Sequence, residues 1–358
     1  MANTKGFFSP LGCEDDARIL TQRMVWAGDP RYAHVSSTSR FLPAQATRRV
    51  LIGGALIRVL PAFLLGTFSS ILLALNTLFW SVPLFTLSAF KLLVPAVAVR
   101  RRIDPMLNWV ATRWISCNNA WIGVLQREPW SVEGADNLRY AGWYLVNCNH
   151  RSWVDIFVLQ RVLNRRIPLL KFFLKQQLIY VPVIGLAWWA LDFPFMRRHS
   201  KAALRKHPEL RNQDRETTRR ACAKFAHVPT SVMNFAEGTR YTPAKHRTQS
   251  SPYRHLLKPK AGALALTLNA MGGRFQSLLD ISIAYPDGTP SFWQLASGQA
   301  GRVMVHIREL PIPPDFCTHD YSTDSAFRSD FHRWLTELWE EKDQQIENML
   351  AQAANRVA

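Results

Sequence analysis

Residues 143–163 read WYLVNCNHRSWVDIFVLQRVL, an apolar run followed by a short polar segment and a second apolar run. The first run, Trp143–Cys148, has the length and residue types of a buried strand, and Trp153–Leu163 predicts a helix. Ser152 suits the N-cap of this helix, and Asp155 falls in its first turn, where the helix dipole favours a carboxylate. A strand that leads through a polar loop into a helix is typical of α/β domains, and this loop carries a histidine.

The alternation of strands and helices continues along the rest of the chain. It predicts an α/β fold, a mixed sheet flanked by helices, rather than an all-helical protein. The chain ends in an amphipathic helix from about 324 to 350, whose apolar stripe favours packing on the domain core over contact with a membrane. The expected strands are Val232–Phe235, Leu279–Tyr285 and Val303–Ile307, the expected helices are Glu216–Ala226 and Ala261–Ala270, and the stripe consists of Phe327, Phe331, Trp334, Leu338 and Trp339.

The run Val59–Phe90 contains no charged residue. A perpendicular transmembrane helix needs about 20 residues, so this run is longer than one such span requires. A tilted span with a trailing interfacial piece and a hairpin that enters and returns both remain open, with Pro61 and Pro83 as natural breaks. Basic residues on both flanks favour a hairpin with both ends on the cytoplasmic face. A buried helix pair of a soluble protein is the alternative, but such helices usually carry a polar face, and we therefore predict membrane attachment.

The chain carries 44 Lys and Arg residues against 26 Asp and Glu, and this net charge of +18 indicates a polyanionic partner. Nucleic acid, anionic lipid head groups and phosphorylated substrates all fit the charge. A nucleic-acid-binding protein would not need the uncharged run, and the sequence has no signature of one. The basic segment Met196–Lys224 suits an anionic membrane surface, the phosphates of CoA, an acidic carrier protein or simple solvation.

The five cysteines are scattered, without a metal-binding spacing. This pattern indicates structural thiols in a reducing compartment. We expect no metal ion and no bound cofactor.

His150 and Asp155 are separated by a loop that lets the carboxylate fold back onto the imidazole. A carboxylate on Nδ1–H fixes the tautomer and leaves Nε2 free as a general base. The sequence has no GxSxG serine elbow beside this pair, so the base would act on a substrate hydroxyl. A second group, FAEGTR at 235–240, follows a predicted strand, with Gly238 suited to a tight turn and Arg240 to bidentate phosphate binding. Taken singly, such a pair or turn is usually structural; together they indicate an active site.

These motifs, with three others, resemble in order and residue type those of the glycerolipid acyltransferase family with the His-x4-Asp signature, the 1-acylglycerol-3-phosphate acyltransferase-like enzymes. The similarity extends over roughly residues 138–310 and includes features of a bacterial branch of probable acyltransferases. The motifs are NHRSWVD (149–155), FLKQQLIYVPVIG (173–185), DFPFMRR (192–198), FAEGTR (235–240) and IAYP (283–286).

The resemblance implies a glycerol-phosphate acyltransferase-like sandwich and a membrane-bound O-acyltransferase. The acyl group would pass from acyl-CoA or acyl-carrier protein, as co-substrate, to the hydroxyl of a lysophospholipid. The acceptor implied is 1-acyl-glycerol-3-phosphate, and the product is phosphatidate.

The resemblance also implies a role for each motif residue. His150 would deprotonate the acceptor hydroxyl and Asp155 would orient it, so that the oxygen attacks the thioester directly, without an acyl-enzyme. Pro286 would end a strand near the acyl donor, and Lys175 would either contact a phosphate or be solvated. The acceptor phosphate site would consist of Glu237, Gly238, Thr239 and Arg240, with Arg198, or alternatively Arg197, from the second block.

Two positions differ from the family pattern. Ala236 stands where the third block has proline, and Asp192 stands where the second block opens with glycine. The Asp192 carboxylate predicts a lower preference for a phosphate acceptor, which keeps another lysophospholipid or a lipid alcohol open as acceptor. A non-catalytic membrane protein of the same fold is a further alternative, although His150 and Asp155 are both present.

The sequence suggests four segments: residues 1–48 as a poorly ordered N-terminal extension, 49–103 as membrane-anchoring helices, 104–322 as the catalytic domain and 323–358 as a C-terminal amphipathic helix packed on it. Met24 is an internal candidate start. The expected location is the bacterial inner (cytoplasmic) membrane, with the catalytic domain on the cytoplasmic face. Expected partners are a lysophospholipid acceptor, an acyl thioester donor and anionic membrane lipids, with acyl-carrier protein as a further candidate and no nucleic acid.

Overall fold

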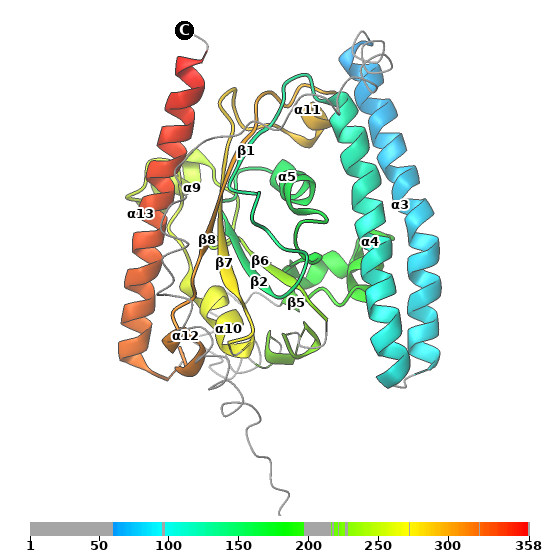
Figure 1. The fold of residues 1–358 in the computed structure, drawn as a ribbon. Helices are drawn as coiled ribbons and strands as arrows, with labels where there is room; N and C mark the ends of the chain where they lie inside the picture. The colour runs from blue at the N-terminus through cyan, green and yellow to red at the C-terminus, as the bar shows by residue number, and fades with distance from the viewer. Residues whose placement is uncertain are drawn as a thin grey trace, which may run out of the picture. The chain divides into compact units, whose positions relative to one another are not determined.

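The computed structural model describes residues 60–94, 97–196, 216, 218–220, 222–225, 228–271, 273–321 and 323–356 (Figure 1). The predicted N-terminal extension lies outside these residues, as do Arg197 and Arg198.

The centre of the described part is a mixed sheet, which confirms the predicted α/β class. Three of its inner strands, Tyr144–Cys148, Ser231–Asn234 and Ser277–Ala284, are buried along their whole length, as expected for a sheet covered on both faces. Strand β7 (Ser277–Ala284) pairs antiparallel with β8 (Met304–Leu310), whereas the other neighbours in the sheet pair parallel. In spatial order the strands are β1 (Ser131–Glu133), β8 (Met304–Leu310), β7 (Ser277–Ala284), β2 (Tyr144–Cys148), β6 (Ser231–Asn234) and β3 (Leu170–Phe172). Two short strands, β4 (Leu174–Lys175) and β5 (Phe195–Met196), form a separate pair.

Helices cover both faces of the sheet (Figure 1). One face packs against α4 (Val97–Leu125), α5 (Val154–Leu163), the 3-10 turn η3 (Gln176–Tyr180) and α6 (Ile184–Ala190), and the other against α10 (Ala261–Met271) and α13 (Ser325–Asn355). The remaining described helices are α3 (Ala62–Leu93), α9 (Pro243–Gln249), α11 (Phe292–Ala296) and α12 (Asp315–Thr318).

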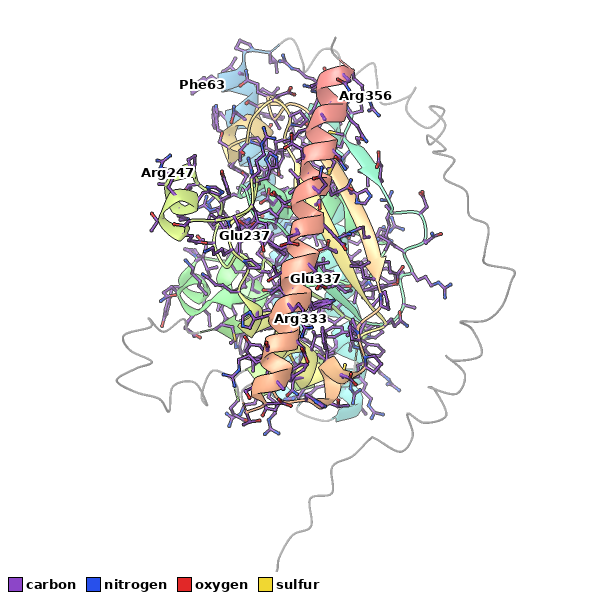
Figure 2. All side chains as sticks on the ribbon, turned by 90° about the vertical axis from the view of Figure 1, so that its left-hand side faces the viewer. Phe63, Glu237, Arg247, Arg333, Glu337 and Arg356 are labelled. Carbon is purple, nitrogen blue, oxygen red and sulfur yellow. The ribbon has the colours of Figure 1, made fainter. Side chains whose placement is uncertain are left out.

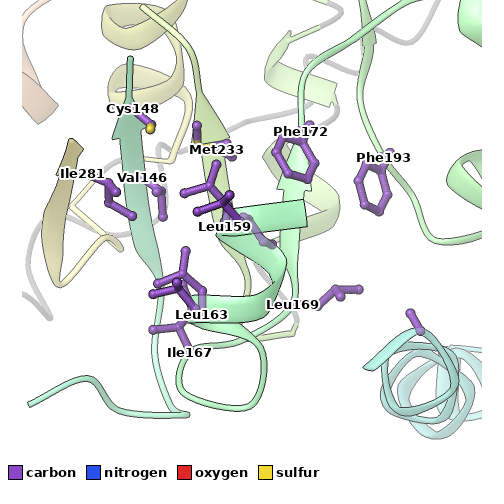
Figure 3. Close-up of a cluster of buried hydrophobic side chains, with 14 of the residues drawn as sticks. Val146, Cys148, Leu159, Leu163, Ile167, Leu169, Phe172, Phe193, Met233 and Ile281 are labelled. Atoms are coloured by element: carbon purple, nitrogen blue, oxygen red, sulfur yellow. The ribbon is translucent and has the colours of Figure 1, made fainter. Parts of the chain in front are cut away.

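The hydrophobic core on the α5 side of the sheet includes Val146 of β2, which is fully buried (Figure 3). Leu159 from α5 and Met233 from β6 belong to the same buried cluster. Phe172 and Phe193 extend it beyond the sheet edge, with ring centroids 6.4 Å apart. The apolar spacing of α5 therefore fixes the helix on the sheet, and with it the position of the polar loop that precedes the helix.

The uncharged run forms one continuous helix of 32 residues, α3. Pro61 precedes the helix, as predicted, but Pro83 lies inside it, so the predicted break at Pro83 is wrong. A proline within a helix removes one backbone hydrogen bond and can be tolerated where the flanking turns are stabilised by other contacts. The hairpin is made instead by α3 and α4, which lie side by side (Figure 1), with Asn76 Nδ2 donating to Asn118 Oδ1 at 2.7 Å.

The side of α3 away from the domain is apolar and exposed. Phe79 and Val82 each keep 67% of their surface accessible, against 0% for Leu84 on the packed side. Further members of this exposed face are Phe63, Leu64, Phe68, Ile71, Leu75, Leu78, Phe90, Leu92 and Leu93. An apolar face of this extent calls for a non-aqueous neighbour.

Helix α13 crosses the second face of the sheet, with Arg333 and Glu337 on its outer side (Figure 2). Its predicted stripe is buried against the sheet. Phe331 and Trp339 are fully buried, and Trp334 packs against the cluster while remaining partly accessible. The helix begins at Ser325, where the Asp324 side chain accepts a hydrogen bond from the Phe327 amide.

Candidate active site

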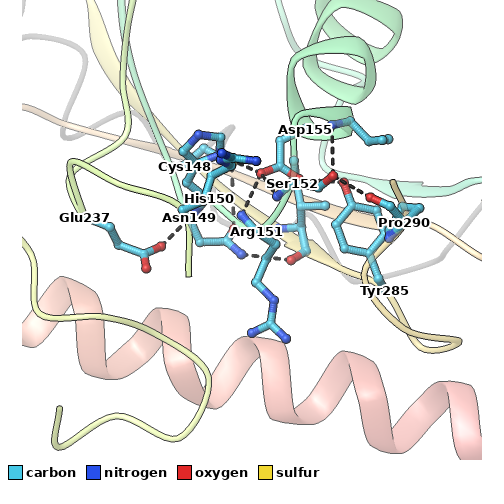
Figure 4. Close-up of polar contacts among 12 residues, drawn as sticks. Cys148, Asn149, His150, Arg151, Ser152, Asp155, Glu237, Tyr285 and Pro290 are labelled. Carbon is cyan, nitrogen blue, oxygen red and sulfur yellow. Dashed lines mark hydrogen bonds and ion pairs between the residues drawn. The ribbon is translucent and has the colours of Figure 1, made fainter. Parts of the chain in front are cut away.

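The loop between β2 and α5 brings His150 and Asp155 into contact (Figure 4). His150 Nδ1 lies 2.8 Å from Asp155 Oδ2. The same oxygen accepts hydrogen bonds from the Arg151 amide at 2.7 Å and the Ser152 amide at 2.9 Å. Because a carboxylate oxygen only accepts, His150 Nδ1 is the donor, and Nε2 is left as the basic nitrogen. The predicted dyad geometry is therefore present.

The second carboxylate oxygen of Asp155 is also occupied. Tyr285 OH donates to Asp155 Oδ1 at 2.6 Å, and burial raises the pKa of this phenol well above its ordinary value. Asp155 has no accessible surface, so its charge is stabilised entirely by these donors. The predicted N-cap at Ser152 is wrong by one residue, because α5 begins at Val154 with Trp153 as its N-cap. The Ser152 hydroxyl oxygen still accepts from the Val154 amide at 3.1 Å, just ahead of the helix.

The imidazole plane is held by an aromatic ring. His150 stacks on Phe235 with centroids 3.9 Å apart and an angle of 15° between the planes. Phe235 in turn lies 6.4 Å from Phe172 in a stacked arrangement. Together with the Asp155 hydrogen bond, this contact fixes both the tilt and the rotation of the imidazole.

Glu237 holds the main chain of the catalytic loop. Its Oε1 accepts from the His150 amide at 2.8 Å, and its Oε2 accepts from the Leu257 amide at 3.0 Å. The side chain has no accessible surface, and burial raises its pKa to about 7. The structure thus places Glu237 behind the loop, where it bonds the backbone of the histidine.

The rest of the FAEGTR motif forms a turn beside the dyad. Gly238 has φ +67°, a left-handed conformation that a side chain would strain, and Lys260 lies alongside it. Thr239 Oγ1 accepts a hydrogen bond from Lys245 Nζ at 2.8 Å. The Arg240 guanidinium is exposed and lies 4.7 Å from the centre of the Trp153 ring. The turn therefore collects three cations, from residues 240, 245 and 260, close to His150.

The other predicted site residues occupy varied positions. Lys175 is exposed on β4, and Pro286 is partly buried directly after Tyr285. Arg197 and Arg198 lie outside the described residues, so their predicted role stays a prediction.

Asp192 has φ +59°, the left-handed conformation that glycine adopts most easily and that aspartate tolerates better than most residues. Lys91 Nζ lies 2.8 Å from Asp192 Oδ2, and Lys224 Nζ lies 2.9 Å from Asp192 Oδ1. Two lysines thus neutralise the Asp192 carboxylate. The sequence had predicted that this carboxylate would disfavour a phosphate acceptor.

Helix α13 braces the site from the far side through the segment 254–257. Asp343 accepts from the backbone amides of Arg254 and His255, each at 2.8 Å, and Trp339 Nε1 donates to the Leu257 carbonyl at 2.9 Å. The same segment contacts the active site, because the His255 carbonyl accepts from Arg151 Nη1 at 2.9 Å. The segment therefore links the C-terminal helix to the catalytic loop.

Sequence reasoning missed several of these groups. Tyr285 and Phe235 lie inside motifs that were recognised, but their contacts with Asp155 and His150 depend on which way the strands face. Lys260, twenty residues beyond the EGTR turn, had no signal beyond its basic character. In the described part of the chain no group of three His, Cys, Asp or Glu side chains is arranged to hold a metal ion.

Residues 130–286 match the family model described as Acyltransferase, and this range contains both the dyad and the FAEGTR turn. The chain is 24% identical over 213 residues to 1-acyl-sn-glycerol-3-phosphate acyltransferase delta of Homo sapiens, covering 56% of this chain and 51% of that protein. It is 23% identical over 213 residues to the gamma enzyme of Mus musculus, with the same coverage. The chain thus spans about half the length of the curated relatives it matches.

Among solved structures, the chain is similar to the crystal structure of the 1-acyl-sn-glycerophosphate (LPA) acyltransferase PlsC from Thermotoga maritima. The match has a TM-score of 0.49 and 18% sequence identity, and it covers 81% of this chain and 98% of that chain.

Proposed function

We propose that this protein transfers a fatty acyl group from a thioester to the hydroxyl of a lysophospholipid, because residues 130–286 match the family model described as Acyltransferase and the chain is similar to 1-acyl-sn-glycerol-3-phosphate acyltransferases. The acceptor proposed is 1-acyl-glycerol-3-phosphate and the product phosphatidate. The observation that carries the proposal is the buried Asp155 bonded to His150 Nδ1, which leaves His150 Nε2 as a basic nitrogen.

In the proposed reaction His150 Nε2 takes the proton of the acceptor hydroxyl while the oxygen attacks the thioester carbon. The carbon–sulfur bond then breaks, and the imidazolium gives its proton to the departing thiolate, so that an ester and a thiol leave a neutral histidine. Asp155 stabilises the imidazolium during this transfer, and Phe235 keeps its plane aligned. The donor is acyl-CoA or acyl-carrier protein, used as a co-substrate.

We place the acceptor phosphate at the FAEGTR turn. Arg240 is exposed there, and Lys245 Nζ points to the same turn through its bond to Thr239. A guanidinium can bind two phosphate oxygens at once, which orients the lysolipid as well as attracting it. Glu237 serves this site indirectly, by holding the His150 backbone.

We propose that α3 attaches the enzyme to a membrane. It is the helix in the described chain that is long and apolar enough to cross one, and its outward face is apolar apart from Thr86, whose hydroxyl donates to the Val82 carbonyl. Its neighbour α4 carries Arg113 near its middle, exposed beside Trp109. An arginine at the centre of a bilayer costs about 3 kcal/mol or more, so a pair that crossed together would be penalised.

This arrangement favours α3 lying along the membrane surface, with its apolar face in one leaflet and α4 on the aqueous side. The helix is about 48 Å long at 1.5 Å per residue, which exceeds the roughly 30 Å of hydrocarbon. We place the enzyme on the cytoplasmic face of a bacterial inner membrane, where acyl thioesters are made.

The test is acyl transfer by detergent-purified protein from labelled acyl-CoA to a panel of lysolipids, with wild type beside His150→Ala. We expect product from lysophosphatidate, lost in the variant, with thermal unfolding and vesicle binding unchanged. Product in a clean preparation of His150→Ala would refute the mechanism. Product only from other lysolipids would keep the His150–Asp155 chemistry and refute the acceptor assignment.

A further inference from the structure

A large cavity lies where the end of α3 meets the start of α4. Its volume is about 760 Å³, and neither residue of the dyad lines it. The walls come from α3, α4, α6 and the segment that precedes β6. The apolar wall consists of Leu92, Pro105, Trp189, Ala190, Val228 and Pro229. Nothing in the proposed reaction uses this cavity.

The polar lining of the cavity is predominantly cationic. Lys91 and Lys224 share the carboxylate of Asp192, and Lys91 also bonds Asp104 at 2.6 Å. Arg100 and Arg101 are exposed at the mouth, and neither pairs with a carboxylate among the described residues. Four cations therefore face two carboxylates, which leaves the cavity with a net positive charge.

A fifth cation lies deeper. Lys171 is 6% exposed and lines a small hollow that shares Asp104, Ala190, Asp192 and Lys224 with the large cavity. Within the described residues, its ammonium has a single partner, the Phe225 ring, whose centroid lies 5.1 Å away. Burial lowers the pKa of this ammonium to about 8, so the group is still mostly charged at neutral pH. A buried ammonium without a hydrogen-bond acceptor is unfavourable, and an anionic ligand would supply the acceptor.

We propose that this cavity binds the phosphate head group of an anionic phospholipid, as a site separate from the catalytic one. The head group lies among Lys171, Lys224 and the two mouth arginines, and the acyl chains leave along Leu92 and Trp189. Both of these side chains are largely exposed, at 59% and 47%, and Leu92 belongs to the apolar face of α3. A free phosphate would satisfy the cations but would leave the apolar wall uncovered.

The site would fix the end of the helical hairpin to the bilayer by a specific lipid. Its position overlaps the basic segment that the sequence suggested only at Lys224, because the other cations, Lys91, Arg100, Arg101 and Lys171, come from α3, α4 and β3. The proposal does not require the acyl-transfer activity, so the two can be tested separately.

The experiment titrates the detergent-purified full chain with dioctanoyl phosphatidylglycerol and counts bound lipid by native mass spectrometry. The variants are Lys171→Met, which keeps the buried volume, and the double change Arg100→Gln with Arg101→Gln at the mouth. The control, Arg328→Gln with Arg333→Gln, removes two exposed cations from α13 on the other side of the sheet. Circular dichroism verifies that each variant is folded.

We expect one saturable lipid on the wild type, bound about tenfold more weakly after Lys171→Met because a charge-assisted contact is lost. The mouth variant should weaken binding at least as much, and the α13 control should leave it within twofold. Equal binding of dioctanoyl phosphatidylcholine, equal affinity of all variants, or an equal loss in the control would overturn the proposal. Displacement of the bound lipid by inorganic phosphate or by CoA at matched concentration would show that the cavity binds a soluble phosphate compound. That result would overturn the proposal of a phospholipid ligand.

Discussion

Replacing Asp155 by asparagine separates the structural and chemical roles of this buried carboxylate. Asp155 Oδ2 accepts from His150 Nδ1 and from the amides of residues 151 and 152, whereas Oδ1 accepts from Tyr285 OH. An asparagine can keep its oxygen toward the three donors and turn its amide toward Tyr285, whose hydroxyl oxygen can accept after its hydrogen rotates. The shape and most hydrogen bonds survive, but the negative charge is lost.

The magnitudes follow from these contacts. One rearranged and partly weakened hydrogen bond lowers the free energy of unfolding by about 1 kcal/mol. The chemical loss is larger, because no charge remains to stabilise the imidazolium when His150 takes the proton. General-base catalysis contributes about 10²- to 10⁴-fold, or roughly 3–5 kcal/mol of activation free energy. We therefore expect kcat to fall by at least about 100-fold in a folded protein.

The assay measures kcat at saturating acyl-CoA and lysophosphatidate, with thermal unfolding on the same preparation. Tyr285→Phe is the matched control, because it removes the donor to Oδ1 and leaves the charge in place. We expect this control to lose less than about tenfold in kcat, as one hydrogen bond is removed from an intact dyad. A kcat for Asp155→Asn above a third of the wild-type value would refute the role of the Asp155 carboxylate in stabilising the His150 imidazolium. An equal loss of kcat in Asp155→Asn and Tyr285→Phe would refute it as well.

Four further predictions concern residues around the dyad and the membrane face. Arg240→Ala should raise KM for a phosphorylated acceptor by about tenfold or more with little change for the donor, and equal effects on both would remove Arg240 from the phosphate site. The pKa of Glu237 is about 7 in the folded protein against 4.5 for an ordinary glutamate, so the unfolded chain ionises first as pH rises. The free energy of unfolding should then fall between pH 4.5 and 7, by about 3 kcal/mol at most. Glu237→Gln should reduce this dependence of the unfolding free energy on pH, measured by chemical denaturation. An unchanged pH dependence in the variant would contradict the assignment of the raised pKa to burial of Glu237. Asp343→Ala, which frees two amides of the bracing segment, should lower kcat more than it changes either KM, and a pure loss of thermal stability would show that the brace is only structural. Phe79→Asp with Val82→Asp should release the protein from vesicles in flotation without changing its far-ultraviolet circular dichroism, and full retention would exclude this face as the attachment surface.

The sequence predicted the strands and helices that carry the dyad because their apolar spacing is local. Strand β2 and helix α5 begin and end within a residue of their predicted limits, and Asp155 bonds His150 as the loop length allowed. Contacts that join distant segments could not be predicted in this way. Whether Phe235 faces His150 depends on the register of β6 against β2, and no local pattern specifies that register.

At Pro83 the local sequence predicts a feature that the structure does not have. A proline in an apolar run predicts a break, yet α3 continues through it because the helix packs along α4 on both sides of that residue. Glu237 was assigned to a phosphate site by resemblance, whereas its contacts are with two backbone amides from separate loops. Tertiary packing decides both cases, and it becomes visible only once the chain segments are placed together.

A helix that lies along one leaflet changes how the enzyme meets its substrate. In the proposed arrangement, the apolar face of α3 would give access to lipids on one side of the bilayer only, so both the lysolipid consumed and the phospholipid formed would belong to that side. The relevant acceptor concentration is then a surface density, and diluting the lysolipid with inert lipid should slow the reaction at constant bulk concentration. Growth of the opposite leaflet would require a separate protein that moves the product across.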